Sequence, residues 1–211
     1  MEINKLSEFK RLFVEFICEA TEFEGLHLTY AQIYEIVNFM NKAESKYTWK
    51  EIEIVRGLKK AYDYVEKLIN ENKHIGIVEF LSMNLLIDEY EEPSAGQWRE
   101  TKVRIGGTDY TPPIYKPIEW HKHVENLITQ PLQSLFDGAK LFATLAKLQC
   151  FTNGNKRTAI CLCNALLIKN NLDLMHVKDH MKFTRKLVDY YEDGESKLVD
   201  FVNYVVESSK E

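Results

Sequence analysis

Chain-breaking residues are scarce in this sequence of 211 residues, which contains 9 Gly and 5 Pro. A chain with so few breakers has few loops, so long helices are expected. The 4 Cys include no C-x-x-C pair, which excludes a disulfide framework and favours the reduced thiols of a cytoplasmic protein. A basic surplus is missing as well. The formal net charge is −5, so nucleic acid is not an expected partner.

Long apolar runs are also missing. The longest, from Ala159 to Ile168, is interrupted by Asn164 and is too short to cross a membrane. Acidic residues occur near the N-terminus, where a signal peptide would be apolar. What is present, 45% apolar and 28% charged residues, is the composition of a globular protein. We therefore expect a single domain over residues 1–211, located in the cytoplasm and without a membrane partner.

Apolar residues recur at helical spacing along most of the chain. One stripe runs from Leu6 to Ala20 and stops at Gly25. Capping boxes at Thr29–Gln32 and Thr48–Glu51 start two further helices, the first with a stripe that includes Met40. Other helices are predicted over about 75–88, from Pro131 onward, over 158–168, up to Tyr191 and over 195–206. The fold class is therefore all-α.

Residues 91–117 interrupt the helical pattern. The segment is rich in proline, contains Gly106 and Gly107, and alternates at Val103 and Ile105. This combination predicts a small β-hairpin with a long arm. A structured loop of this length is more often functional than a plain connector.

A second interruption, at residues 149–156, precedes a helix that is apolar nearly all round. Asn153, Gly154 and Asn155 form a turn that allows left-handed backbone geometry. Lys156 and Arg157 follow in the first helical turn, where the helix dipole disfavours cations. Exposed amides with two cations make a phosphate site. The alternative is that these two side chains reach solvent or a carboxylate elsewhere in the fold.

Three segments together resemble the Fic/Doc family. The run F-T-N-G-N-K-R-T-A from Phe151 resembles the core motif H-P-F-x-D/E-G-N-G/K-R in its Doc-like variant. The run V-R-I-G-G-T-D-Y-T-P-P from Val103 is similar to the family's flap, and T-E-F-E-G-L-H-L-T from Thr21 is similar to its inhibitory helix. The resemblance implies an all-α bundle of about eight helices, with an inhibitory-helix region at 1–28, a β-hairpin flap at 98–116, and the motif loop and central helix at 149–170.

Active members of the family transfer AMP from ATP to a hydroxyl of a target protein, and Doc relatives transfer the γ-phosphoryl group instead. The resemblance implies ATP and Mg²⁺ as cofactors if this chain is active. It places the phosphates on the loop from Asn153 to Arg157 and the γ-phosphate on a second Arg, three residues later. It also implies that a protein target docks by strand addition on the flap residues, which are Val103, Ile105, Gly106, Gly107 and Thr108.

The sequence departs from the motif where the chemistry occurs. Gln149 replaces the motif His, and the loss of a general base typically costs about 10²- to 10⁴-fold. Asn153 replaces the metal-binding acid, so it offers Mg²⁺ only an uncharged oxygen. Ile160 replaces the second Arg. Phe151 is retained as motif support, and Cys150 beside the lost base is interpreted as an inert cysteine.

Glu24 matches the inhibitory glutamate of the family. There this residue pairs with the second motif Arg and blocks the γ-phosphate. With Ile160 at that position, Glu24 lacks its partner unless Lys156 or Arg157 reaches it. If inhibition operates, replacing Glu24 should favour ATP over AMP. The alternative is a plain helix end capped by Gly25.

Three functions are compatible with these residues. The first is a degenerate Fic protein that keeps a nucleotide or phosphate site with little or no AMP transfer. The second is an active nucleotidyltransferase or Doc-like phosphotransferase that uses a different base. The third is a peptide-binding module that uses the flap without catalysis. The sequence leaves open an antitoxin partner, as in toxin–antitoxin systems, and self-association.

Overall fold

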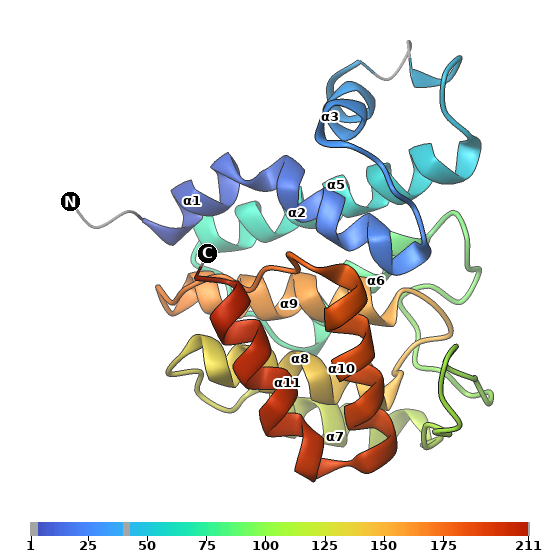
Figure 1. Ribbon diagram of the computed structural model, residues 1–211, viewed down its shortest axis with the longest axis vertical. Helices are drawn as coiled ribbons and strands as arrows, with labels where there is room; N and C mark the ends of the chain where they lie inside the picture. Colours follow the sequence, from blue (N-terminus) through green and yellow to red (C-terminus); the bar gives the residue numbers. More distant parts are fainter. Residues whose placement is uncertain (1–3, 40–42, 211) are drawn as a thin grey trace.

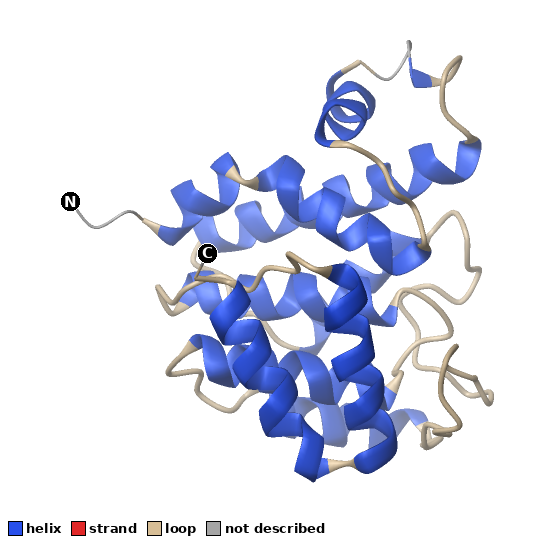
Figure 2. Cartoon of the chain, viewed as in Figure 1, coloured by secondary structure: helices blue, strands red, loops and turns tan. Residues whose placement is uncertain are grey.

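The computed structural model describes residues 4–39 and 43–210. Met40 and the ends of the expected domain, residues 1–3 and 211, lie outside the described residues. Within the described ranges the chain forms ten α-helices and a short 3₁₀ turn, without any β-strand (Figure 2). No helix in this part of the chain has the length and apolar composition needed to cross a membrane.

The elements follow one another with short connections, apart from the segment before α7. In chain order they are α1 (Lys5–Arg11), α2 (Phe13–Thr21), the 3₁₀ turn η1 (Glu22–Glu24), α3 (Tyr30–Asn38), α5 (Trp49–Asn70), α6 (Ile77–Asp88), α7 (Pro117–Ile128), α8 (Leu135–Leu148), α9 (Asn155–Lys169), α10 (His180–Asp193) and α11 (Glu195–Ser208).

Local capping determines where several helices begin. The capping boxes predicted at Thr29 and Thr48 start α3 and α5. Pro131 does not start a helix, because Ser134 caps α8 three residues later with its side chain. Pro117 instead occupies the first turn of α7, a helix that the sequence analysis did not predict.

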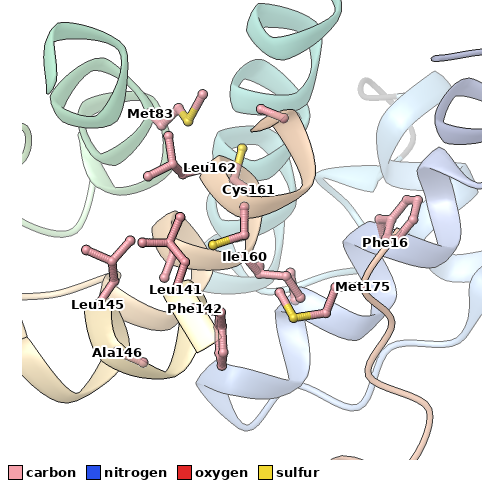
Figure 3. Close-up of a cluster of buried hydrophobic side chains, with 14 of the residues drawn as sticks. Phe16, Met83, Leu141, Phe142, Leu145, Ala146, Ile160, Cys161, Leu162 and Met175 are labelled. Carbon is pink, nitrogen blue, oxygen red and sulfur yellow. The ribbon is translucent and has the colours of Figure 1, made fainter. Parts of the chain in front are cut away.

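Helix α9 lies at the centre of the fold and contacts α8, α6, α5 and α2 (Figure 1). Every residue from Thr158 to Ile168 is buried, as the all-round apolar pattern predicts. Figure 3 shows Ile160 of α9 in a buried apolar cluster that includes Met83 of α6 and Phe142 of α8. This packing fixes α9 and therefore the loop that leads into its N-terminus.

The expected bundle of about eight helices with a β-hairpin flap is wrong in two respects. Ten α-helices are present in the described ranges, and residues 98–116 form a loop without strand pairing. Gly107 does turn the chain, with a φ of 82°. However, Val103 and Ile105 are the only alternating apolar residues beside the glycine turn, and both are half-buried. A two-stranded hairpin needs more apolar cover than this to be stable.

Candidate functional site

The motif loop between α8 and α9 turns through left-handed backbone at both ends. Gln149 ends α8 with a φ of 50°, and Gly154 precedes α9 with a φ of 72°. A Cβ atom on Gly154 would lie 3.2 Å from Asn84 Nδ2 and 3.3 Å from Asp88 Oδ2. Glycine therefore suits both the conformation and the close approach of the loop to α6.

Asn155 holds the loop from inside. Its Oδ1 accepts a hydrogen bond from the Phe151 N–H at 2.9 Å, and its Nδ2 donates to the Phe151 carbonyl at 2.8 Å. The Phe151 ring packs against Phe80 and Trp98. Asn155 was predicted to bind phosphate, but its side-chain amide is used within the loop. Phe151 packs in the core below the loop, as its predicted supporting role requires.

Gln149 occupies the position of the family's general base, and its amide is also used by the loop. Its Nε2 donates to the Ala146 carbonyl at 2.7 Å, and its Oε1 accepts from Asn155 Nδ2 at 3.1 Å. The neighbouring Cys150 is buried, and burial raises the pKa of its thiol to about 12. Neither side chain is therefore a proton acceptor near neutral pH.

Arg157 is fully buried at the start of α9, where three carboxylates from η1 and from the C-terminal end of α6 and its following turn surround it. Its Nε lies 2.8 Å from Glu24 Oε1, and its Nη2 lies 3.1 Å from Asp88 Oδ1 and 3.9 Å from Glu91 Oε2. Of the two alternatives left open by the sequence, Arg157 thus reaches a carboxylate elsewhere in the fold. It also supplies the partner that Glu24 would otherwise lack.

The cluster around Arg157 is not fully satisfied. Nη1 of Arg157 and Oδ2 of Asp88 are buried, and neither has a hydrogen-bond partner within the described ranges. The Nε–H of Arg157 faces Glu24 as an ion pair without the alignment of a hydrogen bond. A buried guanidinium with an unused N–H is the kind of group that an anion can complete.

Electrostatics decide how tightly the cluster is held. Burial raises the pKa of Asp88 to about 6, against the opposing attraction of Arg157, while Glu24 and Glu91 raise it further by like-charge repulsion. Asp88 ends α6 and Arg157 lies in the first turn of α9, two places where the helix dipole disfavours those charges. Their pairing offsets both costs. Sequence analysis missed Asp88, although an acid at the last position of a helix is a usable signal.

Lys156 points to a different environment from Arg157. Its Nζ lies 5.3 Å from the centre of the Phe23 ring in η1. Burial lowers the pKa of the Lys156 ammonium, and Glu24 acts in the opposite direction. Lys156 and Arg157 therefore both lie close to the inhibitory-helix segment that contains Glu24.

The residues at the expected magnesium position do not fit the ion as they are arranged. Asn153 Nδ2 donates to Asp88 Oδ1 at 3.1 Å, so this oxygen of the nearest carboxylate is shared between Asn153 and Arg157, and only the buried Oδ2 is left for an ion. Magnesium prefers carboxylate oxygens that are free to complete an octahedral shell. Across the described ranges, no group of three His, Cys, Asp or Glu side chains is placed to hold a metal.

Ile160, at the position of the family's second Arg, is 1% exposed. Its side chain belongs to the apolar cluster of Figure 3 and not to a polar site. Arg157 is thus the one motif arginine that this chain keeps, and the apolar Ile160 occupies the position of the second motif arginine.

Arg99 is a buried residue of this region that sequence analysis missed. Its Nε donates to the Gln149 carbonyl and its Nη2 to the Pro113 carbonyl, both at 2.7 Å. The Arg99 carbonyl accepts a bond from the Trp120 indole at 3.0 Å. Arg99 therefore fastens the flap to the motif loop. Nothing in the sequence marks it, because an arginine in a proline-rich segment normally indicates exposed surface.

The flap residues lie beside α10. Val103, Ile105 and Thr108 are half-buried, while Gly106 and Gly107 are exposed. Tyr110 packs on Tyr191 of α10 with ring centres 6.1 Å apart, and Thr108 Oγ1 accepts from the Tyr110 N–H at 3.0 Å. No backbone–backbone hydrogen bond involves residues 102–109, all of which are described. The main-chain groups of this stretch are thus available to another chain.

Comparison with known proteins agrees with this geometry. Residues 78–167 match the model of the Fic/DOC family. A protein adenylyltransferase Fic of Aedes aegypti is 23% identical over 209 residues, covering 95% of this chain and 41% of the relative. One of Nematostella vectensis is 27% identical over 167 residues, covering 76% of this chain and 38% of the relative. The chain thus spans about two fifths of the length of these curated relatives.

Solved structures show the same fold. Fic-1 of C. elegans superposes with a TM-score of 0.72 at 19% identity, covering 96% of this chain and 62% of that chain. A Fic-domain signaling protein of Bacteroides thetaiotaomicron gives a TM-score of 0.76 at 15% identity, covering 97% and 85%. The segment that matches the Fic/DOC family model contains nearly all of α6, all of α7 and α8, and most of α9. The resemblance inferred from the motifs is confirmed.

Proposed function

We propose that this chain is a degenerate Fic protein that binds nucleotide phosphates weakly at Arg157 and transfers AMP slowly or not at all. The relatives are named protein adenylyltransferases, and this chain would have the same activity only to the extent that its site keeps the required groups. Its flap would receive an extended segment of a protein target.

The observation that supports this proposal most strongly is the state of Arg157. The guanidinium is buried, keeps one N–H without a partner, and is occupied by Asp88 and Glu24. An incoming phosphate must displace Glu24 and compete with Asp88, so binding is weak. Since Gln149 accepts no proton, a bound nucleotide lacks the group that would activate a target hydroxyl.

Calorimetric titration with ADP and ATP, with and without Mg²⁺, tests the binding half of the proposal. We expect weak binding that changes little with Mg²⁺, because Asn153 and Asp88 are engaged with each other. Incubation of a lysate with α-labelled and γ-labelled ATP tests the transfer half, and neither label should reach protein above background. Absence of nucleotide binding even after Glu24 is replaced would overturn the proposal.

A further inference from the structure

A groove beside the flap has no role in the site described above. A hollow of about 740 Å³ lies between Gly107 of the flap and the N-terminal half of α10, where Met181, Lys182 and Arg185 line it. Figure 1 shows the flap loop next to α10, and the contact of Tyr110 with Tyr191 agrees with this placement.

Charge along α10 is arranged against the helix dipole. Lys182 and Arg185 lie in its N-terminal half, and Glu192 and Asp193 end it. The dipole favours the reverse order. Both basic side chains are exposed, and neither forms an ion pair with any described residue. Lys182 Nζ does lie 4.8 Å from the centre of the Tyr204 ring of α11. The Tyr204 ring gives Lys182 one contact within the fold, whereas Arg185 has no ion-pair partner in the described ranges, so the position of Arg185 points to a requirement outside folding.

The charge and exposure of the other residues that line the groove limit the chemical class of ligand that it can bind. Asp179 is its one carboxylate, and that carboxylate caps α10 by accepting the Lys182 N–H at 2.9 Å. His180 lies 3.7 Å from Glu22. Met181 is 84% exposed, and Val188 is half-buried. The groove thus combines positive charge with apolar surface, next to the unpaired main chain of the flap.

We propose that this groove docks an extended acidic segment of a partner protein, with carboxylates on Lys182 and Arg185 and an apolar side chain on Met181. The proposal rests on the proposed role of the flap in target docking, and it adds the chemical class of the target. An extended peptide can pair its backbone with the flap, which a nucleic acid cannot do. The net charge of −5 also disfavours a long polyanion, which would extend beyond the groove.

Fluorescence anisotropy with three labelled peptides tests the proposal. The probe alternates glutamate and valine around a central threonine, and its two counterparts carry glutamine or lysine in place of glutamate. The full chain should bind the glutamate peptide about tenfold more tightly than the glutamine peptide at low salt, and this preference should shrink as salt is added. Methylation of alternate backbone nitrogens of the probe should weaken binding, because it removes pairing with the flap.

Two double variants separate the groove from net charge. K182E/R185E reverses the groove, and K50E/K122E changes the net charge equally at exposed lysines on α5 and α7. The groove variant should lose about tenfold in affinity for the glutamate peptide, and the control should stay within about twofold of wild type. Folding should suffer little, because Lys182→Glu loses only an exposed contact with the Tyr204 ring and places an acid at the third helical position behind the Asp179 cap. Thermal melting checks this.

The outcomes distinguish this inference from the proposed function. Unchanged ADP binding in K182E/R185E with lost peptide binding supports the inference. Peptide binding without any nucleotide binding would overturn the proposed nucleotide site and leave the groove in place. Equal binding of the glutamate and glutamine peptides, or equal loss in both double variants, would overturn the inference. Tighter binding of a single-stranded oligonucleotide or of anionic lipid vesicles than of the glutamate peptide would also overturn it.

Discussion

Replacing Glu24 with glutamine should increase the affinity of this chain for ADP by about tenfold. A phosphate that approaches Arg157 must first displace the Glu24 carboxylate, 2.8 Å from Nε. A contact to a charged group is worth about 1.5–3 kcal/mol. The Glu24 side chain is 19% exposed and its contact is poorly aligned, so the lower figure applies. That free energy corresponds to about a tenfold change in the dissociation constant.

The contacts of Glu24 in the structure change the set of nucleotides whose affinity should rise when Glu24 is replaced. With the family's pairing in mind, the sequence suggested that Glu24 blocks a γ-phosphate, so that ATP would gain and AMP would not. Here Glu24 contacts Arg157, the arginine that the family resemblance associates with the α- and β-phosphates, and Ile160 is buried in the core. We therefore expect ADP and ATP to gain by a similar factor.

Calorimetric titration of E24Q with ADP and with ATP measures this gain. Glu22→Gln is the matched control, because it removes a neighbouring carboxylate that lies beside His180 and not beside Arg157. The control should stay within about twofold of wild type, as expected for an exposed pair. If E24Q binds ADP no better than the control does, Glu24 does not compete with phosphate for Arg157.

Four further predictions concern the motif loop and the residues that contact it. Because the pKa of Asp88 is raised to about 6, lowering the pH from about 7.5 to 5.5 should protonate it, loosen its hold on Arg157 and strengthen sulfate binding in wild type but not in D88N, as calorimetry would show. The same shift, from a usual value of 3.8, should make the free energy of unfolding fall as pH rises from about 3.8 to about 6, since the folded state holds the proton more tightly than the unfolded state over that range. Arg99→Met should lower the free energy of unfolding in urea by about 2–4 kcal/mol and expose the flap to proteolysis, whereas the same change at the exposed Arg104 should do neither. Gln149→His alone should restore little AMP transfer from α-labelled ATP, since Arg157 remains occupied.

Local sequence signals predicted the parts of the fold that depend on neighbours in the chain. The capping boxes at Thr29 and Thr48 and the all-round apolar pattern of α9 were sufficient, because each is set by residues within a few positions. The hairpin was wrong because a glycine pair and two apolar residues determine a turn but not a pairing. The motif residues themselves were found by their order and spacing.

The contacts of the site depended on distant segments, and the sequence left them open. Arg157 contacts Asp88 of α6, which lies 69 positions earlier in the chain, and Glu24 of η1. The sequence shows that Asp88 and Arg157 each lie at a helix end where the dipole disfavours their charge. Which acid pairs with which base is determined by how α6 packs on α9. Arg99 carried no local signal, because its three carbonyl partners meet only in the folded chain.

The most direct measurement is transfer from α-labelled ATP by the wild-type chain and by E24Q, made alongside ADP titration of both proteins. If Arg157 is retained and the base is lost, E24Q binds ADP about tenfold more tightly and neither protein labels a target above background. AMP transfer by either protein at the rate of an active Fic enzyme would contradict this, because it would require a proton acceptor that Gln149 does not provide.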